Sequence, residues 1–248
     1  MKFRGPLFET VHARTYARSK PDGTKETWQD TVERVVHGNT TLVNTRHIDG
    51  DEPARLLELI GNLHLTPAGR HLWSGGVEGS QHTFNCTVCG FGPHLADHHC
   101  AVMNGLMCGA GVGSAYDPDL IAALPSLAPR AVELFVRCAP SHPDSAEVSP
   151  DQFLSAGQAV FQVPDSREGW VSALQVILDT AEKDGGPVHI DVSEVRPRGS
   201  EIKGFGGTAS GPGPLVKMLR DVCTVLAANT DTKLSALSLM EIDHIISE

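Results

Sequence analysis

The sequence predicts an α/β protein, in which a mainly helical N-terminal region precedes units of alternating strands and helices. Apolar residues recur at helical spacing in TWQDTVERVVHGN (27–39) and in DEPARLLELIGNL (51–63). Farther along, PVHIDVS (187–193) alternates as a strand does, and a glycine-rich loop and a helical pattern from 214 to about 228 follow it. Strand, loop and helix in this order are typical of a parallel α/β unit whose site lies at the C-terminal end of the strand.

Composition and charge exclude several classes of protein. The 248 residues are 40% hydrophobic and 20% charged, as in a globular protein with a core, and no apolar run is long enough to span a membrane. The N-terminus has no apolar segment of the kind that directs secretion, so the six cysteines indicate reduced thiols in the cytoplasm. The net charge of −10 argues against general nucleic-acid binding. We therefore expect neither a membrane nor nucleic acid as a direct partner.

In the N-terminal region, residue types indicate where helices begin and end. Thr27 can cap the first helix, and Gly38 stands where a C-terminal cap is expected. Asp51 precedes the second helix, and TPAGRHLWSGG (66–76) is predicted to be a turn-rich connection. Region 1–80 is thus predicted to be mainly helical.

Three further segments follow from changes in composition. Segment 81–117 starts the α/β part and contains the first cysteines, and 118–163, rich in Ala, Pro and Ser, is predicted to be a peripheral subdomain or insertion. Segment 164–248 contains the α/β units with the glycine-rich loop. GAGVG at 109–113 follows a helical pattern rather than a strand, which indicates close backbone packing and not a dinucleotide fingerprint.

Capping patterns predict the helices of the last segment. Asp165 and Glu168 are spaced as a capping box, and the glycines at 185–186 end the helix that follows. Ser238 and Glu241 form a second such pattern before an apolar helix at the end of the sequence. Because an apolar helix face needs a partner surface, we expect the chain to be part of a larger fold.

The stretch HTFNCTVCG (82–90) leaves several interpretations open. The spacing of Cys86 and Cys89 suits two thiolate ligands of a zinc ion, or a local dithiol that forms a disulfide. Gly90 and Gly92 argue against the helix start that a thioredoxin-type pair requires. A zinc module would draw further ligands from the neighbouring residues His94, His98, His99 and Cys100. As the simpler interpretation, His98 and His99 form a surface pair without a role.

The loop RPRGSEIKGFGGTASGPGP (196–214) combines basic residues with glycines. Glycines allow backbone amides to approach an anion, and Pro214 marks a helix N-terminus, which also favours negative charge. The pattern lacks the Gly-Lys-Ser/Thr ending of a P-loop. Its residues alone leave phosphate binding and a solvated loop equally open.

Two long stretches resemble the adenosylcobalamin-dependent (class II) ribonucleotide reductases, in particular the monomeric triphosphate reductase branch. They are VPDSREGWVSALQVIL (163–178) and DVSEVRPRGSEIKGFGGTASGPGPL (191–215). Four shorter motifs occur in the order that this family shows: RTYAR (14–18), TWQDTVERVVHGN, PAGRHLW and FNC. The resemblance implies a ten-stranded α/β barrel, of which this chain would form only the first part after its helical region.

The resemblance also implies radical chemistry. In the family, homolysis of the cobalamin Co–C bond generates a thiyl radical that abstracts the ribose 3′-hydrogen of a ribonucleoside triphosphate. Two further cysteines supply reducing equivalents as they form a disulfide, which thioredoxin or another dithiol renews. Deoxynucleoside triphosphates act as allosteric effectors.

Individual positions carry these implied roles. Cys86 matches the first cysteine of the reducing pair, and Pro67, Ala68 and Asn85 match positions near the substrate. The stretch from 109 to 210 resembles the region that binds the effector in this family. The matching residues are Gly111, Gly113, Arg196, Lys203, Gly206, Gly207 and Ser210.

The resemblance further implies a longer protein. The radical cysteine, the second reducing cysteine and the adenosylcobalamin site should lie in a complementing C-terminal half, so this chain alone should not turn over substrate. One alternative is a nucleotide-binding regulatory module without catalysis. A zinc-binding module at Cys86 and Cys89 is the other.

Overall fold

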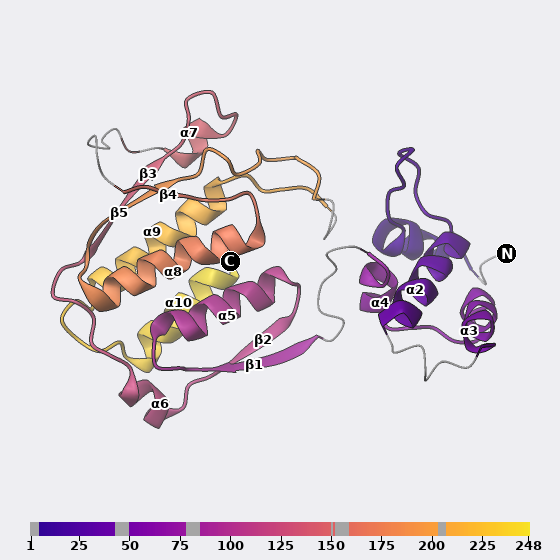
Figure 1. The fold of residues 1–248 in the computed structure, drawn as a ribbon, viewed down its shortest axis with the longest axis horizontal. Coiled ribbons are helices and arrows are strands. Elements are labelled where there is room, and N and C mark those ends of the chain that lie inside the picture. The colour runs from indigo at the N-terminus through magenta and orange to yellow at the C-terminus, as the bar shows by residue number, and fades with distance from the viewer. Residues whose placement is uncertain (1–4, 43–49, 78–84, 150, 152–158, 203–206) are drawn as a thin grey trace. The chain divides into compact units, whose positions relative to one another are not determined.

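The structure is a computed structural model that describes residues 5–42, 50–77, 85–149, 151, 159–202 and 207–248 (Figure 1). It divides into two compact units. Unit 1 contains the described residues of 1–84 and 202–207, and unit 2 those of 85–201 and 208–248. No helix within the described ranges has the length and apolar character needed to cross a membrane.

Unit 1 is helical, as predicted. One face of helix α2 and residues of its neighbours form a small core that contains Trp28, Val32, Val35, Ile60 and Leu72. The Trp28 indole donates a hydrogen bond to the Gly61 carbonyl, which satisfies its only polar atom. The elements of this unit are α1 (Pro6–Val11), a π-helical turn (His12–Tyr16), α2 (Trp28–Leu42), α3 (Glu52–Gly61) and α4 (Gly69–Ser74).

Two local predictions in unit 1 need correction. Helix α2 does not end at Gly38 but continues to Leu42. Gly38 has no left-handed backbone. Instead, a Cβ built on it would lie 2.1 Å from the Gly76 nitrogen. This glycine therefore allows a second backbone segment to approach the helix. The segment 66–76 is also more regular than predicted, because it contains α4.

We expect Gly38→Ala to destabilise unit 1 although alanine is the better helix former. The added methyl group would overlap the Gly76 backbone, and overpacking of this kind costs about 1–3 kcal/mol. The matched control is Gly61→Ala, because a Cβ at that helical position meets only the Gln29 Oε1 atom, at 3.7 Å. Urea unfolding should show a lower midpoint for Gly38→Ala alone. Equal midpoints for the two variants would contradict the close approach.

A buried histidine in unit 1 predicts that the stability of this unit depends on pH. The His12 side chain is 4% exposed, and its Nε2 lies 2.9 Å from the Thr31 hydroxyl. Burial lowers the pKa of His12, and Glu26 opposes this effect while Arg34 adds to it. The native state therefore keeps the imidazole neutral at a pH where the unfolded chain already binds a proton.

Stability of unit 1 is accordingly expected to fall as the pH decreases below about 6.5, the unfolded value for histidine. The loss between pH 7.5 and 5.5 should be up to about 1 kcal/mol. Tryptophan fluorescence in a Trp170→Phe background reports on unit 1, since Trp28 and Trp73 are the remaining tryptophans. His12→Gln should flatten this pH dependence, and an unchanged slope in that variant would assign the effect to other groups.

Unit 2 contains two parallel sheets. Strand β1 (Cys86–Gly90) pairs with β2 (Gly111–Ala115), and helix α5 (Leu95–Met107) connects them. A second sheet has the order β3-β5-β4, with β3 at Val132–Arg137, β5 at Gly186–Asp191 and the short β4 at Phe161–Gln162. The predicted α/β class with parallel strands is thus confirmed.

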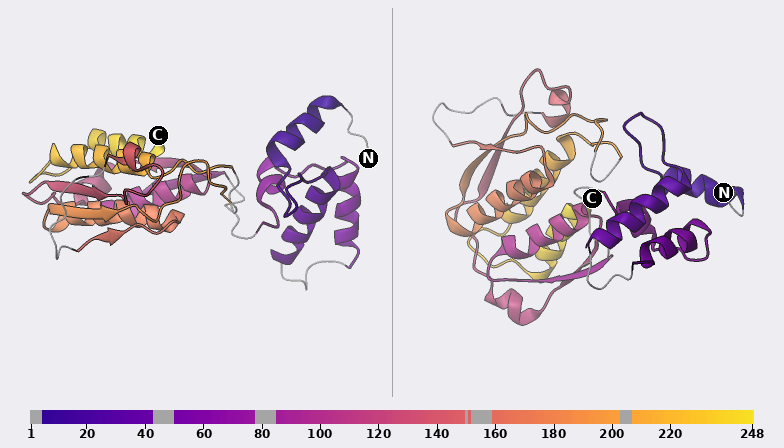
Figure 2. Two further views of the ribbon diagram at one scale, coloured as in Figure 1. Left: turned by 90° about the horizontal axis from the view of Figure 1, so that it is seen from above. Right: turned by 45° about the vertical axis from the view of Figure 1, so that its right-hand side comes forward.

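Helices pack between and beside these strands (Figures 1 and 2). Helix α5 contacts both β1 and β2, α8 contacts β5, and α9 contacts β3. The last helix, α10, packs on α5 and α9, so its apolar face is covered within this chain. The remaining helices are α6 (Pro118–Ala123), α7 (Ser145–Val148), α8 (Arg167–Lys183), α9 (Gly213–Ala227) and α10 (Ala236–Ser247).

The structure changes three predictions for unit 2. Segment 118–163 was expected at the periphery, but its strand β3 pairs with β5, and Val136 is fully buried in the common core. Helix α8 is capped by Ser166, whose hydroxyl accepts from the Gly169 amide, and not by Asp165. Helix α10 likewise begins after Ser235 rather than at Ser238. The predicted helix stop at Gly185 and Gly186 is confirmed, since both have positive φ.

Candidate functional site

Cys86 is the first residue of β1 and lies on the exposed face of the β1–β2 pair. Side chains alternate between the faces of a strand. Cys86 and Val88 are therefore exposed, with Val88 75% exposed, whereas Thr87 and Cys89 lie on the partly buried inner face. The thiol of Cys86 belongs to an open surface of the unit, and that of Cys89 points toward its interior.

Glycines of the neighbouring strand keep the surface beside Cys86 open. Cys86 is in register with Gly111, and Val88 with Gly113. Neither glycine has a side chain to cover the cysteine, and a Cβ on Gly113 would make only ordinary contacts. Asn85 precedes the strand and is also exposed. The structure thus places Cys86, Asn85, Gly111 and Gly113 side by side.

The strand geometry separates the two cysteines that sequence spacing had joined. Residues three apart on a strand face opposite sides, so Cys86 and Cys89 cannot readily form a local dithiol or chelate one ion. The described residues do not gather these cysteines with the nearby histidines into a group with metal-ligating geometry. Both interpretations of the pair are therefore corrected by the fold.

The other cysteines differ from Cys86 in their surroundings. Burial raises the pKa of Cys100 and of Cys223 to about 12, so both remain thiols at neutral pH. Cys108 is buried and accepts a hydrogen bond from Arg167, and Cys138 is buried as well. All six cysteines are free, and Cys86 is the exposed one.

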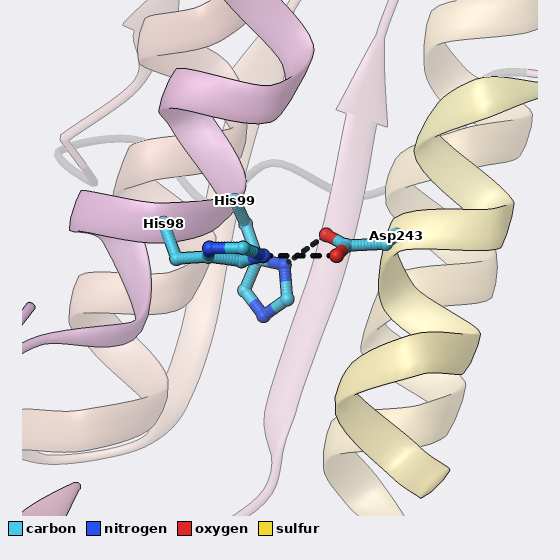
Figure 3. A group of neighbouring side chains, drawn as sticks. All are labelled: His98, His99 and Asp243. Carbon is cyan, nitrogen blue, oxygen red and sulfur yellow. Dashed lines mark hydrogen bonds and ion pairs between the residues drawn. The ribbon is translucent and has the colours of Figure 1, made fainter. Parts of the chain in front are cut away.

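A buried polar cluster lies on the inner face of the β1–β2 pair. The Asp243 carboxylate on α10 accepts hydrogen bonds from four side chains (Figure 3 draws the two histidines). His98 Nε2 and His99 Nδ1 lie 2.9 and 2.8 Å from its oxygens, and the hydroxyls of Ser114 and Tyr116 lie at 2.6 Å. These donors come from α5, from β2 and from the residue after β2, so one carboxylate joins them all to α10.

Electrostatics in the cluster favour an ionised aspartate. Burial opposes the charge of Asp243, but the hydrogen bonds from His98, His99, Ser114 and Tyr116 outweigh it and hold its pKa well below the usual range. Burial lowers the pKa of His99, although Asp243 partly compensates. Burial and the bond to Asp243 raise the pKa of Tyr116 to about 12. At neutral pH the tyrosine is therefore a hydrogen-bond donor and the aspartate an acceptor.

Sequence reasoning missed this cluster and predicted His98 and His99 as a surface pair. Both are fully buried in the structure. One signal was present: LADHHCAVMNGLM is apolar on nearly every side, and a helix of this kind is usually buried all round. Histidines inside such a helix need buried partners. Asp243 stands in a similarly apolar run, LMEIDHII.

The glycine-rich loop connects β5 to α9, and its arginines are paired with carboxylates. Arg196 binds Asp165 with its guanidinium and its backbone amide, and Arg198 pairs with Glu147. A bridge between Glu201 and Thr208 closes the loop. Gly207 (φ +83°) and Ser210 lie in its return segment, and the predicted residues Lys203 and Gly206 are outside the described residues.

The structure divides the predicted effector residues between two places. Gly111 and Gly113 lie on β2, beside Cys86. Arg196, Gly207 and Ser210 belong to the loop that follows β5, a strand of the other sheet. The predicted substrate residues Pro67 and Ala68 are in unit 1, where they precede α4.

Comparisons with known proteins agree with the motifs. Residues 1–77 match the family model for the ribonucleotide reductase alpha domain, and residues 142–226 match that for the insertion domain of B12-dependent ribonucleotide reductase. The chain is 41% identical to a putative adenosylcobalamin-dependent ribonucleoside-triphosphate reductase of Mycobacterium phage D29, with 98% of this chain and 38% of that protein covered.

A bacterial relative and a crystal structure give the same result. The adenosylcobalamin-dependent ribonucleoside-triphosphate reductase of Lacticaseibacillus paracasei is 32% identical over 98% of this chain and 39% of its own length. The crystal structure of a B12-dependent (class II) ribonucleotide reductase superposes with a TM-score of 0.82 and 29% identity, covering 96% of this chain and 39% of that one. The chain thus spans about two-fifths of the length of these relatives. Over nearly all of its residues, it is related to the N-terminal part of the class II, adenosylcobalamin-dependent ribonucleoside-triphosphate reductases.

Proposed function

We propose that this chain forms the N-terminal part of a ribonucleoside-triphosphate reductase and that Cys86 is one of its two reducing cysteines. The observation that carries the proposal is the exposure of Cys86 on β1, beside glycines that leave its thiol open to a substrate. The α/β part of this chain would be completed to a barrel by a further segment that supplies the radical cysteine. We also propose that this part consists of four sequence segments, which are 1–80, 81–117, 118–163 and 164–248.

The proposed reduction requires two thiols for each substrate. The ribose C2′–OH bond breaks and the oxygen leaves as water, while a hydrogen takes its place on C2′. The two electrons come from the Cys86 sulfur and a second cysteine sulfur, which join as a disulfide. The five other cysteines of the chain do not share the exposed face of β1, so the second sulfur must come from the complementing segment. A dithiol such as thioredoxin then reduces the disulfide again.

Substrate and effector contacts are assigned to different parts of the chain. Asn85 lies next to Cys86 and is proposed to contact the substrate, as are Pro67 and Ala68. A deoxynucleoside triphosphate effector is proposed at the loop after β5. Its phosphates would compete with Asp165 and Glu147 for Arg196 and Arg198, because these arginines are already ion-paired.

The hollow found at α1, among the residues that the structure describes, does not suit adenosylcobalamin. This hollow, lined by Pro6, Glu9, Thr10, Ala13 and Arg14, opens widely to solvent. It offers two charged side chains and no enclosure for a corrin ring. We therefore assign the cofactor to the complementing segment and derive no step of this chain through it.

A reconstitution assay tests the proposal. The chain is mixed with a ribonucleoside triphosphate, adenosylcobalamin and a dithiol, with and without the complementing segment of a relative such as the phage D29 protein. Deoxynucleotide should form only when both parts are present. The same assay with each deoxynucleoside triphosphate added shows whether an effector changes the rate. A folded mixture that associates but forms no deoxynucleotide would contradict the proposed function.

A further inference from the structure

Two histidines and an aspartate converge in the interior of unit 2 from distant parts of the sequence. His98 and His99 are fully buried on α5, and the Asp243 side chain on α10 is 10% exposed. One ligand-type atom from each lies within 4.8 Å of the others (Figure 3). Two imidazoles and a carboxylate are a common ligand set for zinc and related divalent ions.

His98 has an oxygen neighbour at each of its ring nitrogens. Its Nδ1 lies 3.2 Å from the Gly90 carbonyl oxygen. Its Nε2 lies 2.9 Å from Asp243 Oδ2, on the side of the ring that faces His99 and the carboxylate. The backbone contact thus holds the ring while Nε2 is directed into the cluster.

His99 adds a second indication. Its Nδ1 faces Asp243 Oδ1, and its Nε2 is buried without a hydrogen-bond partner among the described residues. A buried polar atom without a partner is unusual and requires an explanation. Histidines that bind metals commonly hold a carboxylate or a carbonyl with the other ring nitrogen. His98 shows this arrangement with the Gly90 carbonyl.

We propose that His98, His99 and Asp243 bind one divalent transition-metal ion, with Zn²⁺ as the ion to test. Ser114 and Tyr116 would orient the carboxylate through their hydroxyl groups. The site is enclosed, so the ion serves structure: it links α5 to α10 beneath the strand that carries Cys86. This inference does not depend on the proposed reductase activity.

Zinc content and binding by the full chain test the proposal. After treatment with a chelator and dialysis, calorimetry with Zn²⁺ should show about one ion per chain, and Asp243→Asn and His99→Gln should reduce bound zinc to below about 0.1 per chain. His244→Gln is the matched control, because His244 is exposed on the same helix. A double variant, Cys86→Ser with Cys89→Ser, should bind as the parent does.

Further measurements keep the test decisive if a ligand variant fails to fold. Tyr116→Phe keeps the three ligands and should weaken zinc binding about 10- to 100-fold. The Co²⁺ form of the parent chain should lack the near-ultraviolet absorption that thiolate ligands produce. The proposal is overturned if the folded parent chain binds neither Zn²⁺ nor Co²⁺. It is also overturned if the cysteine variant loses binding while Asp243→Asn keeps it.

Discussion

Replacing Asp243 by asparagine is expected to destabilise unit 2 by about 3–5 kcal/mol, because several hydrogen bonds to one charged acceptor, each contributing about 1.5–3 kcal/mol, are lost or weakened together. The carboxylate accepts from His98, His99, Ser114 and Tyr116. An asparagine side chain has the same shape but presents an NH₂ group to donors on one side. At least one buried donor then loses its acceptor, and the remaining donors lose a charged one.

The measurement is urea unfolding followed by far-ultraviolet circular dichroism, in a chelating buffer so that no metal ion contributes. The control is Asp221→Asn, which removes a carboxylate from the exposed surface of α9, where it pairs with Lys217. That variant should unfold near the parent midpoint, since exposed ion pairs contribute little. If the two variants unfold alike, the Asp243 carboxylate does not hold the cluster.

Single donors offer a graded comparison with the same assay. Ser114→Ala and Tyr116→Phe each remove one hydrogen bond to a charged acceptor, and each should cost about 1.5–3 kcal/mol. Because the donors share one carboxylate, the losses in the double variant are not expected to add. Hydrogen exchange of the α5 and α10 amides would locate the loosened region.

Most elements could be predicted from the sequence, because periodicity depends on local residue order. The apolar faces of 27–39, 51–63 and 214–228 all became helices with those faces inward. Helix ends were less predictable. Ser166 and Asp165 are adjacent candidates for one cap, and the choice depends on Arg196, which binds Asp165 from 31 residues away. The role of Gly38 was equally hard to predict, because only the close approach of the Gly76 backbone in the structure explains why a glycine stands there.

The two parts of the site differ in what the sequence could show. The motif FNC led to Cys86, but its relation to Cys89 depended on whether the segment was a strand or a turn. Once β1 is known, alternation of side chains decides the question. The Asp243 cluster could not be predicted from spacing, because its partners lie about 130 to 145 residues apart and meet only when α10 packs on α5.

Cys86→Ser is expected to abolish dithiol-dependent deoxynucleotide formation in the reconstituted enzyme. A serine hydroxyl is nearly the same size as the thiol but cannot give up electrons by forming a disulfide. Cys89→Ser is the matched control, three residues along the same strand and on its inner face. It should retain most of the parent activity, because its side chain does not reach the exposed face.

Chemical labelling of this chain alone makes the assignment testable without a partner. Alkylation is faster at an exposed thiol than at one buried in the core, where access is blocked and a raised pKa leaves little thiolate. Iodoacetamide should therefore modify Cys86 first and Cys223, which is buried and has a raised pKa, last, as mass spectrometry of peptides can show. Full activity of Cys86→Ser in the reconstituted enzyme would exclude the redox role. Slow labelling of Cys86 in the native chain would contradict the open face of β1, on which that role depends.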